Sequence, residues 1–225
     1  MRVNVGKSKV MRCTRNEDGT RLNVMLEGEV LEEVDHFKYL GSIISANGGV
    51  EADVSHRVNE GCKVFGAVNG VIRNRGLGMD VKKTLYEKVI VPTVTYGSEL
   101  WGMKERERQK LNVFEMRCLR SMCGVSRLDR LRNEEVRGRT GVEMDLANRV
   151  DRNVLRWFGH VERMEDERLL KRVVNARVDG RGARGRPRFG WMDGVRKALN
   201  DRMDVREAKE RARNRNEWRR MVMQL

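Results

Sequence analysis

The chain has 225 residues, of which 39% are hydrophobic and 36% are charged, and its formal net charge at pH 7 is +14. This length is enough to bury a core in one or two domains, while the high charged fraction predicts loosely packed parts. The longest apolar run, residues 89–94, is far too short to span a bilayer, and residues 1–4 open no apolar signal-peptide core. We therefore expect an intracellular protein, nuclear or cytoplasmic, with no membrane partner.

The positive charge belongs to the second half of the chain. Residues 1–101 carry 14 Lys/Arg and 13 Asp/Glu, whereas residues 102–225 carry 33 and 20, so the two net charges are +1 and +13. A strongly basic half is typical of a protein that binds a polyanion. The alternative is a solvated surface with an excess of arginine.

The first 49 residues predict a small antiparallel sheet of two or three strands. Residues 7–11 end one strand, residues 22–26 alternate at period two, and Gly28 turns the chain back through residues 30–31. Residues 37–44 form a third strand, in which Gly41 supplies the backbone freedom of a tight turn. A sheet this small needs a partner face. We therefore expect it to pack against helices.

From residue 50 onward the apolar spacing becomes helical. The expected apolar stripes are Val54-Val58-Cys62-Phe65-Val68, Val81-Leu85-Val89, Leu111-Phe114-Cys118-Met122, Leu146-Val150-Val154-Val161 with Trp157 or Phe158, and Leu169-Leu170-Val173-Val174. Asp80 begins the second helix, Pro92 ends or kinks it, and Gly124 caps the third. Asn133 is expected to cap a short helix that stops near Gly138 or Gly141. The expected fold class is mainly α with a small N-terminal antiparallel β-sheet, an α+β protein with a helical bundle.

Residues 179–190 interrupt the helical pattern with four glycines, four arginines and a proline, which predicts an exposed basic loop or linker. Residues 204–225 are helical by composition, with a thin apolar face. The expected divisions are residues 1–49 for the sheet, 50–125 for the first helical bundle, 126–178 for connecting helices, 179–190 for the loop and 191–225 for basic C-terminal helices.

The chain lacks the residue patterns of a metal site or of the common catalytic classes. The cysteines Cys13, Cys62, Cys118 and Cys123 match neither a disulfide framework nor a Cys-x-x-Cys pair, and His160 is the only histidine after them. No nucleophile elbow, phosphate-binding loop or His-Glu-x-x-His motif is present. We expect reduced thiols and neither a bound metal nor a cofactor.

Six segments, in order, resemble the reverse transcriptases of LINE-type (non-LTR) retrotransposons. They are Lys7-Ser8-Lys9, Phe37-Lys38-Tyr39-Leu40-Gly41, Tyr96-Gly97-Ser98-Glu99-Leu100-Trp101, Asn133-Glu134-Glu135-Val136, Leu155-Arg156-Trp157-Phe158-Gly159-His160-Val161-Glu162-Arg163-Met164, and Gly185-Arg186-Pro187 followed by Trp191 and Asp193. Each segment alone is a weak signal, but six in the right order make a strong one. The resemblance implies the last palm strands with the primer grip, the helical thumb and a C-terminal connector.

The resemblance also implies which chemistry this stretch lacks. In that family, polymerisation uses aspartates that hold two Mg²⁺ ions, and they lie upstream of the primer-grip string. Only about forty residues precede Phe37 here, and no two aspartates are adjacent anywhere in the chain. We expect the chain to be no enzyme as it stands, although the longer parent would be an RNA-directed DNA polymerase.

The binding function that remains is a grip on RNA or on an RNA–DNA duplex through the phosphate backbone. On the strand, Lys38 points away from the face shared by Phe37 and Tyr39, and the arginines of the fifth helix lie along one side. The Arg-Gly stretch, residues 180–188, offers flexible cations followed by an aromatic residue that can stack on bases. The candidate nucleic-acid-binding residues are Lys38, Tyr39, Arg149, Arg152, Arg156, Arg163, Arg181, Arg184, Arg186, Arg188 and Trp191.

Each candidate also has a structural interpretation. The strand aromatics can simply cover a helix, the Arg-Gly stretch can be a linker, and the arginine side of the helix can be a solvated face. The sequence therefore leaves three alternatives to a binding remnant: a truncated fragment of an active polymerase, a translated relic, and a co-opted module that contacts protein.

Overall fold

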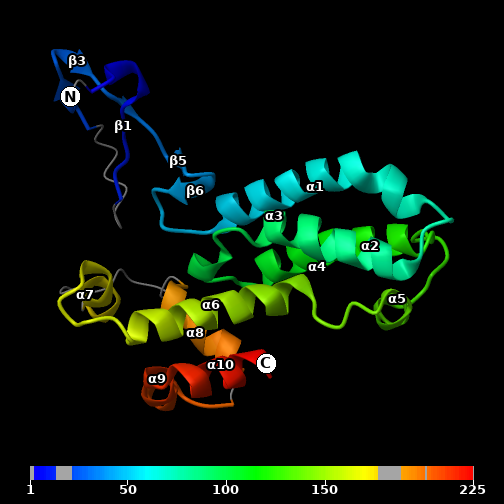
Figure 1. Ribbon diagram of the computed structural model, residues 1–225. Coiled ribbons are helices and arrows are strands. Elements are labelled where there is room, and N and C mark those ends of the chain that lie inside the picture. Colours follow the sequence, from blue (N-terminus) through cyan, green and yellow to red (C-terminus); the bar gives the residue numbers. More distant parts are fainter. Residues whose placement is uncertain (1–2, 14–21, 177–188, 201, 225) are drawn as a thin grey trace. The chain divides into compact units, whose positions relative to one another are not determined.

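The structure is a computed structural model that describes residues 3–13, 22–176, 189–200 and 202–224. Most of these residues are helical, and the strands lie within the first 45 residues, which confirms the predicted fold class (Figure 1). No helix in the described ranges is long and apolar enough to cross a membrane. The chain divides into two compact units, Met1–His56 and Arg57–Leu225, and the division falls inside the long helix α1 (Glu51–Arg73).

In the described part of the first unit, the strands form three separate two-stranded pairs in place of one sheet. After a short 3-10 turn, η1 (Val5–Lys7), β1 (Lys9–Val10) pairs in parallel with β4 (Glu32–Glu33), where Lys9 and Glu32 form an ion pair. β2 (Met25–Leu26) and β3 (Glu29–Val30) form an antiparallel hairpin. Its turn residues Glu27 and Gly28 have φ angles of 51° and 85°, which confirms the predicted turn at Gly28.

The predicted third strand, residues 37–44, is wrong as a single strand. It is a hairpin of β5 (His36–Tyr39) and β6 (Ser42–Ser45), with Phe37 opposite Ile44. Leu40 and Gly41 both have positive φ angles, 47° and 87°, so the chain reverses in two residues. The tight turn at Gly41 was expected. The hairpin is joined to the start of α1 because the buried Asp53 carboxylate accepts a hydrogen bond from the Ile43 N–H at 2.8 Å.

The second predicted helix is longer than expected and buries a different face. It comprises α2 (Met79–Leu85), a π-helical turn η2 (Tyr86–Ile90) and α3 (Val91–Thr95). Tyr86, Ile90 and Val94 are fully buried, whereas Val81 is 52% exposed, so the predicted stripe is wrong. The set one position later carries larger side chains and buries more apolar surface. Pro92 is tolerated in the first turn of α3, where its missing N–H costs least.

The third and fourth predicted helices are present where the apolar spacing placed them. In α4 (Glu105–Met122), all four predicted stripe residues are buried, and Gly124 follows the helix with a φ of 67°. In α5 (Asn133–Thr140), the N-cap position is Arg132, and Gly141 closes the helix in the left-handed conformation. Asn133 is therefore the first residue of the helix and not its cap.

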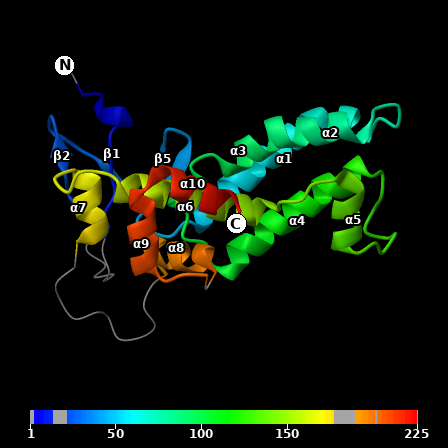
Figure 2. The same cartoon turned by 60° about the horizontal axis from the view of Figure 1, so that its bottom comes forward.

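Helix α6 (Leu146–Glu162) lies at the centre of the second unit. Its N-cap Asp145 accepts a hydrogen bond from the Asn148 N–H at 2.7 Å. Around α6 pack η3 (Ser98–Leu100), α8 (Trp191–Leu199), α9 (Val205–Arg213) and α10 (Arg215–Met223), as Figures 1 and 2 show. The predicted sixth helix, α7 (Leu169–Asn175), is separate from α6, and Leu169 is 73% exposed.

The docking of α10 on α6 depends on a tryptophan and a glycine. The Trp218 indole N–H donates to the Leu155 carbonyl at 2.8 Å, and its ring lies 5.6 Å from the ring of Phe158. A Cβ on Gly159 would come within 2.1 Å of the Trp218 Nε1 atom. Gly159 therefore provides the space in which α10 approaches α6.

Candidate nucleic-acid interface

Helices α6 and α10 bring two rows of arginines side by side. Helix α10 runs antiparallel to α6, because its end at Met223 contacts Arg152 and Arg156 while its start at Arg215 lies beside Arg163. Arg219 is four residues from both Arg215 and Met223 and therefore shares their face. We call these five arginines the arginine seam: Arg152, Arg156 and Arg163 of α6, and Arg215 and Arg219 of α10.

Two arginines of the seam are held by the carbonyl ends of neighbouring helices. Arg152 donates to the Met223 carbonyl at 3.0 Å, and Arg163 donates to the Ala212 carbonyl at 2.7 Å. Each guanidinium thus lies at the negative end of a helix dipole, which stabilises its charge. Arg156 is exposed and contacts the Met223 sulfur at 3.5 Å. These contacts fix the guanidinium groups without neutralising them.

The seam is an environment of like charge. Partial burial, followed by the charges of Arg156 and Arg149, lowers the pKa of Arg152. Partial burial and the neighbouring Arg215 likewise lower the pKa of Arg163. Within the described ranges, no carboxylate forms an ion pair with any of the five seam arginines. Among the described residues, the buried Nε atom of Arg152 has no hydrogen-bond partner.

Arg149, the fourth arginine predicted on this helix, is engaged elsewhere. It forms an ion pair with Glu87 of η2 at 3.1 Å and donates to the Met144 carbonyl at 3.2 Å. The structure therefore places Arg149 in a link between α6 and η2, apart from the two arginine rows.

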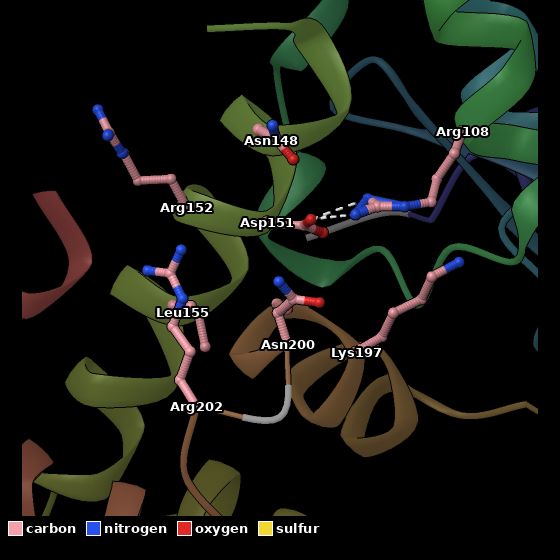
Figure 3. Close-up of a pocket in the computed structure, with 9 residues that line it drawn as sticks. Arg108, Asn148, Asp151, Arg152, Leu155, Lys197, Asn200 and Arg202 are labelled. Atoms are coloured by element: carbon pink, nitrogen blue, oxygen red, sulfur yellow. Dashed lines mark hydrogen bonds and ion pairs between the residues drawn. The ribbon is translucent and has the colours of Figure 1, made fainter. Parts of the chain in front are cut away.

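A polar pocket adjoins the seam where α10 ends (Figure 3). Its volume is about 220 Å³, and α4, α6, α8 and the turn after α8 supply its walls. The lining residues are Arg108, Asn148, Asp151, Arg152, Leu155, Lys197, Ala198, Asn200 and Arg202. Arg152 belongs to both the pocket and the seam, and Arg202 donates to the Gln224 carbonyl at 3.4 Å, next to the Met223 carbonyl that Arg152 binds. The two features are therefore continuous.

Inside the pocket, Asp151 and Arg108 point toward each other and form an ion pair (Figure 3). Burial raises the pKa of Asp151 to about 6, although the charges of Arg108 and Lys197 act in the opposite direction. Lys197 forms an ion pair with Glu105 at 3.0 Å at the solvent edge, where the Glu105 carboxylate is 83% exposed. The pocket therefore holds more positive than negative charge.

Trp191 lies in a packed position. Its indole N–H donates to the Glu99 carbonyl at 2.9 Å, and its ring is 6.5 Å from that of Phe158. The side chain is half-buried, so part of it faces solvent. Its predicted stacking on bases stays a prediction.

The remaining predicted residues do not join the seam. Lys38 and Tyr39 lie in the first unit, in β5, and both are exposed. Arg181, Arg184, Arg186 and Arg188 lie outside the described residues. In the described ranges, no group of three His, Cys, Asp or Glu side chains is placed to hold a metal ion.

Sequence reasoning missed most of the pocket and two of the five seam arginines. Arg215 and Arg219 stand four residues apart on a helix with a thin apolar face, and that spacing is the signal that was available. The pocket residues Arg108, Lys197 and Arg202 come from three separate segments. Only the packing of α4 and α8 against α6 brings them together.

Comparison with known proteins gives one informative relative. The chain is 26% identical over 211 residues to an uncharacterized transposon-derived protein of Caenorhabditis elegans, covering 90% of this chain and 74% of the relative. No protein-family model matches the chain, and no solved structure matches it. The similarity supports a transposon origin.

Proposed function

We propose that this chain is a non-catalytic part of a retrotransposon reverse transcriptase that binds RNA or an RNA–DNA duplex through the phosphate backbone. The transposon-derived relative and the six ordered segments support the origin. The observation that carries the binding function is the arginine seam, in which five guanidinium groups gather without a carboxylate partner in the described ranges.

The spacing of the seam suits a row of phosphates. Arg152 and Arg163 are eleven residues apart, which corresponds to about 16 Å along a helix axis. A duplex carries one negative charge per about 1.7 Å of its axis, so several phosphates lie within reach of a row of this length. Arginine forks bind phosphate oxygens in pairs and read no base edge. The binding is therefore expected to be independent of sequence and weakened by salt.

The anchoring of the seam adds to its affinity. Arg152 and Arg163 are already oriented by helix carbonyls, so binding a phosphate costs them less side-chain entropy than it costs a free arginine. Arg156 and Arg219 are exposed on the two sides of the seam. Charge can be removed at these two positions without breaking the hydrogen bonds to helix carbonyls that hold Arg152 and Arg163.

The test is a salt titration of duplex binding by the double variant Arg156→Gln/Arg219→Gln, followed by fluorescence anisotropy. Loss of two phosphate contacts should reduce the slope of log affinity against log salt by about 2. The matched control is Arg206→Gln/Arg211→Gln on α9, which removes the same charge from arginines already paired with Glu210 and Glu207. Equal losses in both variants would contradict a specific role for the seam.

The non-catalytic part of the proposal has its own test. Primer extension on an RNA template with Mg²⁺ or Mn²⁺ should give no incorporation by the purified 225-residue chain, because two-metal catalysis needs clustered carboxylates. Reproducible incorporation would overturn this part and leave the binding proposal standing.

A further inference from the structure

The pocket beside the seam is shaped to receive a small anion. Arg108, Lys197 and Arg202 bring three positive charges to walls that also carry the amides of Asn148 and Asn200. One lining carboxylate, Asp151, opposes them, and Lys197 also pairs with the exposed Glu105 at the solvent edge. The guanidinium of Arg152 points away from Asp151 in Figure 3, so this residue contributes its stem to the wall.

The role of Asp151 is to orient Arg108. Both terminal nitrogens of Arg108 donate to the same Asp151 oxygen, which holds the guanidinium at the pocket wall. Arg108 and Asp151 are each mostly buried, with side chains 15% and 19% exposed. Lys197 and Arg202 come from the opposite side, on α8 and the turn after it, and are more accessible. The charge available to a ligand comes mainly from these two residues.

The pocket is a recess with walls from α4, α6 and α8, and such a recess favours the end of a chain over its middle. An internal phosphodiester continues in both directions and has one negative charge, so it suits an open groove such as the seam. A phosphate monoester has one attachment, approaches two negative charges at neutral pH and offers three acceptor oxygens. Such a group can enter a pocket of about 220 Å³ and engage cations from both walls.

We propose that the pocket formed by Arg108, Lys197, Arg202 and the two asparagines binds a phosphate monoester, the terminal phosphate of a nucleic-acid strand whose backbone lies along the arginine seam. The shared residue Arg152 and the adjacent Met223 and Gln224 carbonyls make the pocket and the seam one continuous track. The strand-end assignment rests on the proposed backbone binding, whereas the affinity of the pocket for a monoester does not.

The experiment compares single-stranded RNA oligonucleotides of one sequence with a 5′-phosphate, a 3′-phosphate or hydroxyl groups at both ends. One of the two phosphorylated forms should bind about tenfold more tightly than the hydroxyl form, as expected for one charge-assisted interaction. The Lys197→Gln/Arg202→Gln variant should lose this preference, so that it binds the phosphorylated forms and the hydroxyl form equally well. A preference that persists in this variant, or the lack of any preference, overturns the strand-end assignment.

A second arm separates the pocket from the seam. Thermal unfolding is followed with inorganic phosphate, a nucleoside 5′-monophosphate or the nucleoside alone, in wild type and in Lys197→Gln/Arg202→Gln. Stabilisation by both phosphates in wild type, lost in the variant, supports the pocket even if oligonucleotides fail to bind and the proposed function fails. If neither phosphate stabilises the wild type, the pocket proposal is wrong, whatever the seam does. The Arg206→Gln/Arg211→Gln control should respond as wild type does in both arms.

Discussion

Charge is used in opposite ways at the two ends of the helical unit. Between α4 and α5, Glu115 is fully buried and is satisfied by the Tyr86 hydroxyl at 2.9 Å and by Arg137 at 2.5 Å. Along α6 and α10, by contrast, the arginines donate to helix carbonyls and to a thioether, and they face one another. The first arrangement is internally neutralised, whereas the second keeps its charge.

The difference indicates where a partner is expected. A buried carboxylate that accepts hydrogen bonds from two side chains specifies how helices fit together. A row of arginines without carboxylates costs stability through mutual repulsion, and an anionic partner removes that cost. Mutations that disturb the first region should therefore change folding, and mutations that disturb the second should change binding.

The largest expected effect is that of Glu115→Ala. Removal of this carboxylate leaves the buried Tyr86 hydroxyl and the partly buried Arg137 guanidinium without their partner, so we expect a loss of about 3–5 kcal/mol in unfolding free energy. Chemical denaturation followed by circular dichroism measures it. The control is Glu135→Ala, whose carboxylate pairs with Arg139 at the surface, and its expected change is below about 1 kcal/mol. Equal effects of the two substitutions would contradict the contrast between the buried and the exposed pair.

The next effect tests whether the seam depends on the docking of α10. In Gly159→Ala the added methyl group would overlap the Trp218 indole, which should displace α10 and cost about 1–3 kcal/mol. Duplex binding should weaken at the same time, because Arg215 and Arg219 move with the helix. The matched control is Gly138→Ala in α5, where a Cβ has nothing within 4 Å, so a gain of up to about 1 kcal/mol is expected. Wild-type stability and binding in Gly159→Ala would show that the two rows do not need this contact.

The smallest expected effect is a change in pH dependence. The pKa of Asp151 is about 6, above its ordinary value of 3.8, because burial outweighs the pull of Arg108. Its contribution to stability is therefore fully present below about pH 4 and is lost as the pH rises through 6. When the pH is raised from 4.5 to 7, the unfolding free energy of wild type should fall further than that of Asp151→Asn, by up to about 2 kcal/mol.

Urea denaturation at the two pH values gives this difference, and Glu105→Gln is its control. The hydrogen bond and the charge of Lys197 hold the pKa of the exposed Glu105 below its ordinary value. Glu105 therefore adds to folding stability at pH values above that ordinary pKa, and this contribution is lost as the pH falls. Identical pH profiles of Asp151→Asn and wild type would mean that Asp151 is not the titrating group.

The elements that were predicted well are those whose own residues decide their structure. The stripe from Leu111 to Met122 is long and regular, and Gly124 and Gly141 both close helices in the left-handed conformation. The turn at Gly28 likewise follows from local backbone preference. The same reasoning failed for residues 37–44 because Leu40, a residue that rarely takes a positive φ, does so in this hairpin.

The candidate surface was predicted in part, because some of it depends on packing. The arginines of α6 share one side by helical spacing alone, so they were found. Their approach to α10 requires the Gly159–Trp218 contact, and Arg149 is separated from them because it pairs with Glu87. Sequence spacing predicts neither of these contacts. The pocket combines residues 108, 151, 197 and 202, which only the folded arrangement brings together.

The most direct test of the seam is site-specific photocrosslinking to an RNA–DNA duplex. A photoreactive phenylalanine analogue replaces Met223, which is 52% exposed within the seam, or Leu128, which is 90% exposed in the α4–α5 connection. Neither substitution removes a charge, so binding itself should persist. We predict that the duplex crosslinks to position 223 and not to position 128, and that added salt reduces the yield. Equal crosslinking at the two positions, or crosslinking at 128 alone, would contradict the seam as the binding surface.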